Sequence, residues 1–323
     1  MKRKSGHEKT LELIKSTHEM TPEDALLALT ECTKKGFSLA SVKAVQFISK
    51  LDCLGVVDAL LSVYSWAEED AHKRDNLCNI RAEIVNALGE IDSNEISAAA
   101  NKTLCKAART VHITKVSAVP EDTAICLRAN AALALAKTDP NSLYELLLLL
   151  HDKESDVRQA AARALSILGD VGAPPLLTVK LKFPEKENSD VLAECLESLI
   201  FLRPPYLMEV VKPFLDGADE YLAAITALAL AENLREEVLD LLVETLENVH
   251  GETKEAVVVA ISATRCNRAK QILLEFLKNP NTYIRRGAVK GIKSYLDDEI
   301  EEKLNTIYKF DTDEKVRQAA QMD

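Results

Sequence analysis

The chain has 323 residues, and 47% of them are hydrophobic, which is enough to bury a large core. It contains only 10 glycines and 10 prolines, and its formal net charge is −11. An acidic surface repels phosphate backbones, so this charge argues against a general nucleic-acid binder. The seven cysteines form no C-x-x-C pair, which favours free thiols in a reducing compartment.

Neither a secretory signal nor a membrane span is expected. The first ten residues, MKRKSGHEKT, are basic, but no apolar run follows them directly. The longest uncharged stretch tested as a span covers residues 222–231, which is far shorter than the roughly 18 residues that a membrane helix needs. We therefore expect a soluble, cytoplasmic protein of prokaryotic type.

The N-terminal part of the chain is expected to be helical but irregular. Pro22 at a first helical position, with Glu23 and Asp24 behind it, is typical of a helix start. Residues 1–37 are interpreted as N-terminal capping helices, and residues 38–137 as irregular repeats. Two insertions, at 67–79 and 111–123, interrupt the repeats and are expected to form connecting loops that are either functional or inert.

Residues 138–323 contain a recurring sequence motif. Residues 155–169 read SDVRQAAARALSILG, with a capping pair, a Val-Arg pair, small residues and a closing glycine. From Leu127 onward, corresponding positions recur every 29 to 34 residues. Such a period marks a helical repeat array, so we expect one all-α solenoid over residues 1–323. About nine helix pairs are expected from the anchor positions Val42, Ile80, Leu127, Val157, Val191, Glu220, Thr253, Ile284 and Val316.

The motifs SDVRQAAARALSILG, IRAEIVNALGEI and KVRQAAQ resemble the second helix of HEAT repeats. More narrowly, they resemble the short prokaryotic kind also found in phycobilin-lyase-like proteins. The resemblance implies an armadillo-type superhelix whose second helices line a concave face. It also implies a ladder between adjacent repeats, made by a turn Asp and the Arg after Val. By match, this ladder comprises Asp156 and Arg158, with Arg81, Arg128, Arg285 and Arg317 as equivalents.

No catalytic signature is present in the sequence. It lacks G-x-G-x-x-G, G-x-x-x-x-G-K-S/T, H-E-x-x-H and G-x-S-x-G, and no two of its six histidines lie three or four residues apart. We therefore expect a non-enzymatic protein with no cofactor and no metal.

Charge is segregated along the chain. Residues 216–255 hold eleven acidic and two basic residues, whereas residues 265–293 hold eight basic residues and one acidic residue. Within the basic segment, Arg286, Lys290 and Lys293 share one helix face. Either this face binds an anionic group, or its cations offset the acids of the preceding repeat. The candidate partner-binding residues are Arg286, Lys290, Lys293, Arg163, Arg265 and Arg268.

The sequence favours an interaction scaffold that binds a protein or peptide, with an acidic segment as a candidate ligand, in its concave groove. A HEAT-like DNA-binding protein or DNA glycosylase is one alternative, although the only tryptophan, Trp66, lies far from the basic segment. A tetrapyrrole (bilin) lyase or chaperone subunit is the other, on resemblance alone. The partner and the oligomeric state are not determined by the sequence.

Overall fold

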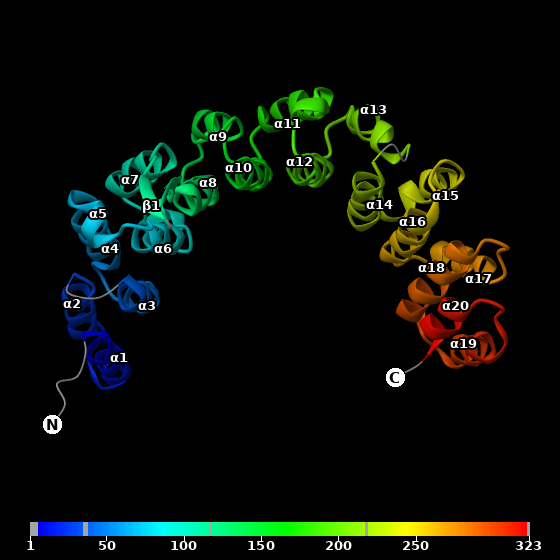
Figure 1. The fold of residues 1–323 in the computed structure, drawn as a ribbon, viewed down its shortest axis with the longest axis horizontal. Helices are drawn as coiled ribbons and strands as arrows, with labels where there is room; N and C mark the ends of the chain where they lie inside the picture. The colour runs from blue at the N-terminus through cyan, green and yellow to red at the C-terminus, as the bar shows by residue number, and fades with distance from the viewer. Residues whose placement is uncertain (1–5, 35–37, 117, 217–218, 322–323) are drawn as a thin grey trace. The chain divides into compact units, whose positions relative to one another are not determined.

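A computed structural model describes residues 6–34, 38–116, 118–216 and 219–321. The chain divides into two compact units, residues 1–173 and 174–323, which are described separately. Both units consist of short helices in pairs (Figure 1), which confirms the predicted all-α solenoid fold. That residues 1–323 form one continuous array stays a prediction. None of the described helices is long and apolar enough to cross a membrane.

The first unit contains helices of 4 to 14 residues and one short hairpin. Two 3-10 turns, η1 and η2, follow helices α1 and α6. The elements are α1 (Gly6–Ser16), η1 (Thr17–Glu19), α2 (Pro22–Thr33), α3 (Ser38–Ile48), α4 (Val56–Glu69), α5 (Ala71–Arg74), α6 (Asn79–Leu88), η2 (Ser93–Glu95), α7 (Ala98–Ala108), β1 (Ile113–Val116), β2 (Val119–Asp122), α8 (Ile125–Thr138), α9 (Leu143–Leu149) and α10 (Ser155–Leu168).

The second unit follows the same plan without strands among its described residues. Its elements are α11 (Ala173–Lys182), η3 (Pro184–Lys186), α12 (Ser189–Leu202), α13 (Leu207–Val211), η4 (Lys212–Leu215), α14 (Glu220–Leu234), η5 (Arg235–Val238), α15 (Leu239–Asn248), α16 (Gly251–Ala263), α17 (Asn267–Phe276), α18 (Thr282–Ile292), η6 (Lys293–Tyr295), α19 (Asp298–Phe310) and α20 (Glu314–Ala320).

Within each unit, the second helix of a pair packs on the second helices of its neighbours. Helix α8 lies between α6 and α10 in the first unit, and α16 lies between α14 and α18 in the second (Figure 1). Each pair thus buries an apolar face that it could not bury alone. The expected face of α10 is buried at Val157, Ala161, Ala164 and Leu165, and Gly169 ends the helix in the left-handed region, at φ 65°.

Small residues let α16 and α18 approach closely. A Cβ atom added at Gly287 of α18 would lie 2.8 Å from both the carbonyl oxygen of Glu255 and the Cβ of Val258. Real side-chain contacts are longer than this, so only glycine fits here without a shift of one helix. Gly287 therefore fixes the distance at which side chains of α16 and α18 meet.

The described residues of the two insertions include a helix and a hairpin, whereas connecting loops were expected. Residues 67–79 include the end of α4, the short helix α5 and a turn in which buried Asp75 accepts hydrogen bonds from the backbone N–H of Ile80 and Arg81. Residues 111–123 contain the antiparallel hairpin β1–β2, with Ile113 opposite Asp122 and Val116 opposite Val119. The β-branched residues that interrupt the helical period thus pair as strands. Of the expected capping segment 1–37, residues 1–5 and 35–37 lie outside the described residues.

Candidate partner-binding site

Buried arginines connect successive repeats through the turns between paired helices. The Arg128 guanidinium, 2% exposed, donates to Asp152 at 2.7 and 3.1 Å and to Asp122 at 2.9 Å. Asp122 precedes Arg128's own helix, whereas Asp152 belongs to the next repeat's turn. Arg285 likewise donates to both Asp311 oxygens, at 3.0 and 3.1 Å. These contacts place the expected arginines in an inter-repeat ladder.

The acid assigned to this ladder from the sequence was wrong. Arg128 reaches Asp152, six residues before Arg158, and not Asp156. Arg158 donates to the backbone oxygens of Asp152 and Lys153. Asp156 instead lies in the first turn of α10, where a carboxylate interacts favourably with the helix N-terminus. Arg81 and Arg317 occupy equivalent positions: Arg81 pairs with Asp75, and Arg317 donates to the Asp311 carbonyl oxygen.

Glu255 lies at the centre of a charged cluster between α16 and α18. Its side chain is 8% exposed and accepts from the guanidinium of Arg286 and, at 2.7 Å, from Nζ of Lys290. Glu252 lies 3.7 Å from Arg286 on the solvent side. The Arg286 guanidinium also stacks on the ring of Tyr283, 5.3 Å from its centroid. The two candidate cations on α18, Arg286 and Lys290, therefore pair with one buried acid.

The protonation state of the cluster follows from these contacts. Burial alone would raise the pKa of Glu255, but hydrogen bonds from Arg286 and Lys290 outweigh burial and lower it. The hydrogen bond to Glu255 raises the pKa of Arg286, against the effect of burial. Glu255 and Arg286 are therefore both charged at neutral pH.

An open groove of about 570 Å³ borders this cluster, and we name it the Glu255 groove. Its walls come from α14, α16 and α18 and are mostly apolar, whereas its charged groups gather on α16 and α18. Leu228 is 42% exposed, although it is a large apolar side chain. The lining residues are Ala224, Ile225, Leu228, Glu252, Glu255, Ala256, Val259, Ala260, Arg286 and Lys290.

Comparison with known families gives a clear result. The profile described as HEAT repeats matches residues 116–200 and 208–293, which is more than half of the chain. The chain is a HEAT-repeat protein. A comparison with curated proteins gives no match. Glu255, Arg286 and Lys290 all lie within the second matched segment.

The other candidate residues of the HEAT repeats are dispersed. Lys293 donates to the carbonyl oxygen of Gln321 at 2.8 Å. Arg268 forms an exposed ion pair with Asp240, and Arg265 is exposed at a left-handed backbone position, at φ 53°. Arg163 is exposed on α10 in the first unit, so a surface shared with Lys290 stays a prediction. Within the second unit, the structure brings together Arg286 and Lys290, but not Lys293, Arg265 or Arg268.

Sequence reasoning missed Glu255 and the apolar walls of the groove. Glu255 lies two residues after the repeat anchor Thr253, and Arg286 lies two residues after the anchor Ile284. Opposite charges at the same position of successive HEAT repeats were the available signal. Comparing repeats column by column would have identified this pair, whereas summing charge over segments did not.

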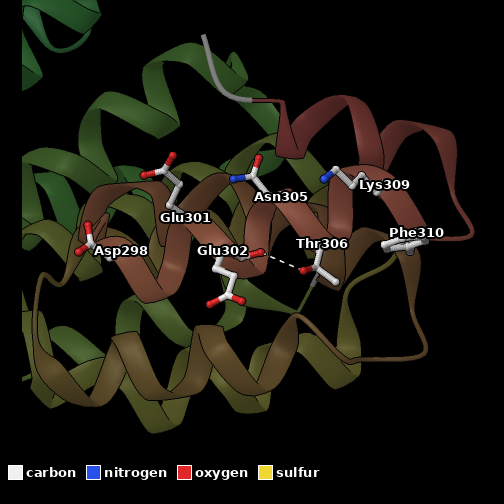
Figure 2. A pocket seen from close by; sticks show the side chains of 7 residues that line it. All are labelled: Asp298, Glu301, Glu302, Asn305, Thr306, Lys309 and Phe310. Atoms are coloured by element: carbon white, nitrogen blue, oxygen red, sulfur yellow. Dashed lines mark hydrogen bonds between the residues drawn. The ribbon is translucent and has the colours of Figure 1, made fainter.

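A second hollow, of about 500 Å³, lies along one face of α19 (Figure 2). All of its lining residues belong to this one helix, including three carboxylates and the exposed ring of Phe310. The Thr306 hydroxyl donates to the backbone oxygen of Glu302 at 2.9 Å, a contact internal to the helix. This hollow is an acidic helix face, and we assign it no role. Among the described residues, no group of three or more His, Cys, Asp or Glu is placed to bind a metal ion.

Proposed function

We propose that this HEAT-repeat protein is a non-enzymatic, cytoplasmic interaction scaffold, and that the Glu255 groove binds a segment of a partner protein. The supporting observation is an open groove whose apolar walls include the half-exposed Leu228 and whose central acid is already paired. Apolar surface left open beside a satisfied charged cluster favours a partner that covers it. All seven cysteines are free thiols, which supports a reducing compartment.

The groove also indicates the chemistry of the bound segment. Lys290 is 54% exposed at the rim, so its ammonium can meet a partner carboxylate while Glu255 holds its inner side. We therefore infer an amphipathic segment with apolar side chains against Leu228 and an acidic residue near Lys290. The repeat spacing of 29 to 34 residues supports the narrower assignment to short prokaryotic, phycobilin-lyase-like repeats, which remains part of this proposal.

The paired state of the cations favours a protein partner over nucleic acid. Arg286 and Lys290 share Glu255, and Glu252 lies beside them, so the cluster has no net charge for a phosphate backbone. Binding to DNA gains most of its affinity from unpaired cations that displace counterions. The groove therefore supports the glycosylase alternative less well than it supports a scaffold.

A pair of matched variants tests the proposal. Leu228→Glu places a charge in the groove, whereas Leu296→Glu changes a similarly exposed leucine, at 50%, in the same unit but outside the groove. Affinity capture with quantitative mass spectrometry, before and after nuclease treatment, should show proteins lost only with Leu228→Glu. The same set with both variants would overturn the groove assignment, and a set lost on nuclease treatment would favour the nucleic-acid alternative.

A further inference from the structure

The β1–β2 hairpin places polar side chains inward and apolar side chains outward along its first strand. Side chains alternate sides along a strand, and a half-buried strand normally turns its apolar residues inward. Here His112 is 8% exposed and Thr114 is half-buried, whereas Val111 and Ile113 are 59% and 50% exposed. Two β-branched apolar side chains are therefore left uncovered beside a strand whose polar side chains face the protein.

Polar contacts hold the inner side of the hairpin against the first insertion. The Thr114 hydroxyl donates to the side-chain oxygen of Asn76 at 2.7 Å, and the Thr123 hydroxyl lies 3.1 Å from the backbone oxygen of Asn76. The His112 ring packs on the His72 ring, with 4.5 Å between the two centroids. An isolated hairpin is marginally stable, so these contacts fix it in place and present its outer edge already ordered.

The hydrogen-bond register shows which backbone groups point outward. Among the described residues, β1 and β2 form a sheet of two strands, so each has an outer edge. The Thr123 N–H donates to the His112 carbonyl oxygen at 2.9 Å, and bonded pairs alternate with non-bonded pairs from there. Ile113 and Lys115 are therefore in non-bonded pairs, and their backbone N–H and C=O groups point away from β2.

The two outer edges differ in what they offer. Pro120 lies opposite Lys115, and because proline has no N–H, the outer edge of β2 lacks a donor there. The outer edge of β1 keeps the donors and acceptors of Ile113 and Lys115, and no other group of the described chain forms a hydrogen bond with them. We name these outward groups the β1 edge. Unpaired backbone groups of this kind can pair with a further strand.

We propose that the β1 edge binds an extended segment of a partner protein as an additional antiparallel strand. Ile113 and Lys115 each exchange two backbone hydrogen bonds with one residue of the segment. The segment residue opposite Lys115 is acidic, because Lys115 is exposed and no described acid pairs with it. The residue opposite Ile113 is apolar and β-branched. In chain order the segment therefore reads acidic residue, any residue, apolar residue.

Charge favours such a segment over a second copy of this chain. In an antiparallel pairing of two β1 edges, the outward residues of the second copy are again Ile113 and Lys115. Lys115 would then lie opposite an isoleucine or another lysine, and like charges opposite each other destabilise a sheet. A lysine on an edge strand also opposes pairing between copies.

The first experiment titrates a peptide into the full chain, labelled for NMR at its isoleucine and lysine amides. The probe is acetyl-Thr-Glu-Thr-Val-Thr-Val-Ser-amide, whose Glu lies opposite Lys115 when its first Val lies opposite Ile113. Four backbone hydrogen bonds correspond to a Kd of about 1 mM. We expect saturable shifts of the Ile113 and Lys115 amide resonances, and slower hydrogen exchange of these two amides in the bound state.

Two N-methylated peptides test whether the backbone makes the contact. Methylating the nitrogens of Glu and the first Val removes the donors that face β1, whereas methylating the second and third Thr removes donors that face solvent. We expect the first peptide to bind at least about tenfold more weakly than the unmethylated probe. The second should bind within about twofold of the probe, because its lost donors have no partner in the complex.

A charge exchange tests the acidic residue of the segment. Lys115→Glu should weaken binding of the probe at least about threefold and should favour, by a similar factor, the peptide with Lys in place of Glu. Lys115 is exposed, so this variant should keep the stability of the wild type. Leu228→Glu, in the Glu255 groove, should bind the probe as wild type does, so the two proposals can fail separately.

Four outcomes would overturn the proposal. One is the absence of saturable shifts up to about 10 mM probe, tenfold above the expected Kd. A second is equal affinity of the two N-methylated peptides, which would show a contact of side chains alone. A third is an unchanged peptide preference in Lys115→Glu. The fourth is a dimer in sedimentation equilibrium whose Ile113 and Lys115 amides are protected without peptide, which would make a second copy the occupant.

Discussion

Glu255 and Arg286 occupy the same position in successive repeats, 31 residues apart, and form a buried ion pair across the α16–α18 interface. The contact is possible because Gly287, next to Arg286, lets the two helices approach closely. Lys290 adds a second cation to the same carboxylate. The charge of one repeat is thus matched by its neighbour, and the groove beside the pair is left mostly apolar.

Replacing Arg286 with methionine should destabilise the α16–α18 interface. Methionine has a similar length but no charge, so buried Glu255 is left with Lys290 as its remaining ion-pair partner. Breaking a buried pair on one side is costly, and with Lys290 in place we expect a loss of about 2 kcal/mol. Hydrogen exchange of α16 and α18 amides measures this loss. The Arg286→Met, Glu255→Gln double variant should recover part of this stability. A double variant whose loss of unfolding free energy equals or exceeds the sum of the two single losses would contradict the pairing.

Arg128→Ala should destabilise the protein more than a matched change at an exposed ion pair. It leaves both Asp122 and Asp152 without the guanidinium between them, and we expect a loss of about 3–5 kcal/mol. Arg268→Ala, which breaks the exposed pair with Asp240, should change stability little. Urea unfolding of both variants measures the difference. Equal midpoints would show that the ladder contributes no more than a surface ion pair.

Helical periodicity and the Arg of the Val-Arg pair could be predicted, because both depend on residues close together in sequence. Asp152 could not be told from Asp156, because the acid that Arg128 reaches lies in the next repeat and is selected by packing. The β1–β2 hairpin showed in the sequence only as β-branched residues that broke the period. Glu255 was missed for the same reason: a contact 31 residues away is invisible to a local charge count.

Acid should weaken the contribution of Glu255 to stability. Its pKa is lowered in the folded protein, from about 4.3 in an unfolded chain, so its ionised form contributes stability above that value. This contribution is lost as pH falls through the unfolded and then the folded pKa. The difference in unfolding free energy between wild type and Glu255→Gln should therefore shrink from pH 6 to about pH 3.5. A difference in unfolding free energy between wild type and Glu255→Gln that stays constant over this pH range would contradict the prediction.

Gly287→Ala tests the close approach on which the groove depends. Alanine favours a helix over glycine by about 1 kcal/mol, so in an open helix this change should stabilise the protein. Here the added Cβ would lie 2.8 Å from the Glu255 carbonyl oxygen and from Val258, and both are held within α16. We expect a net loss of about 1–3 kcal/mol, with faster hydrogen exchange confined to α16 and α18. A gain in stability would mean that the two helices are farther apart than described, and that Arg286 and Glu255 do not form the buried pair.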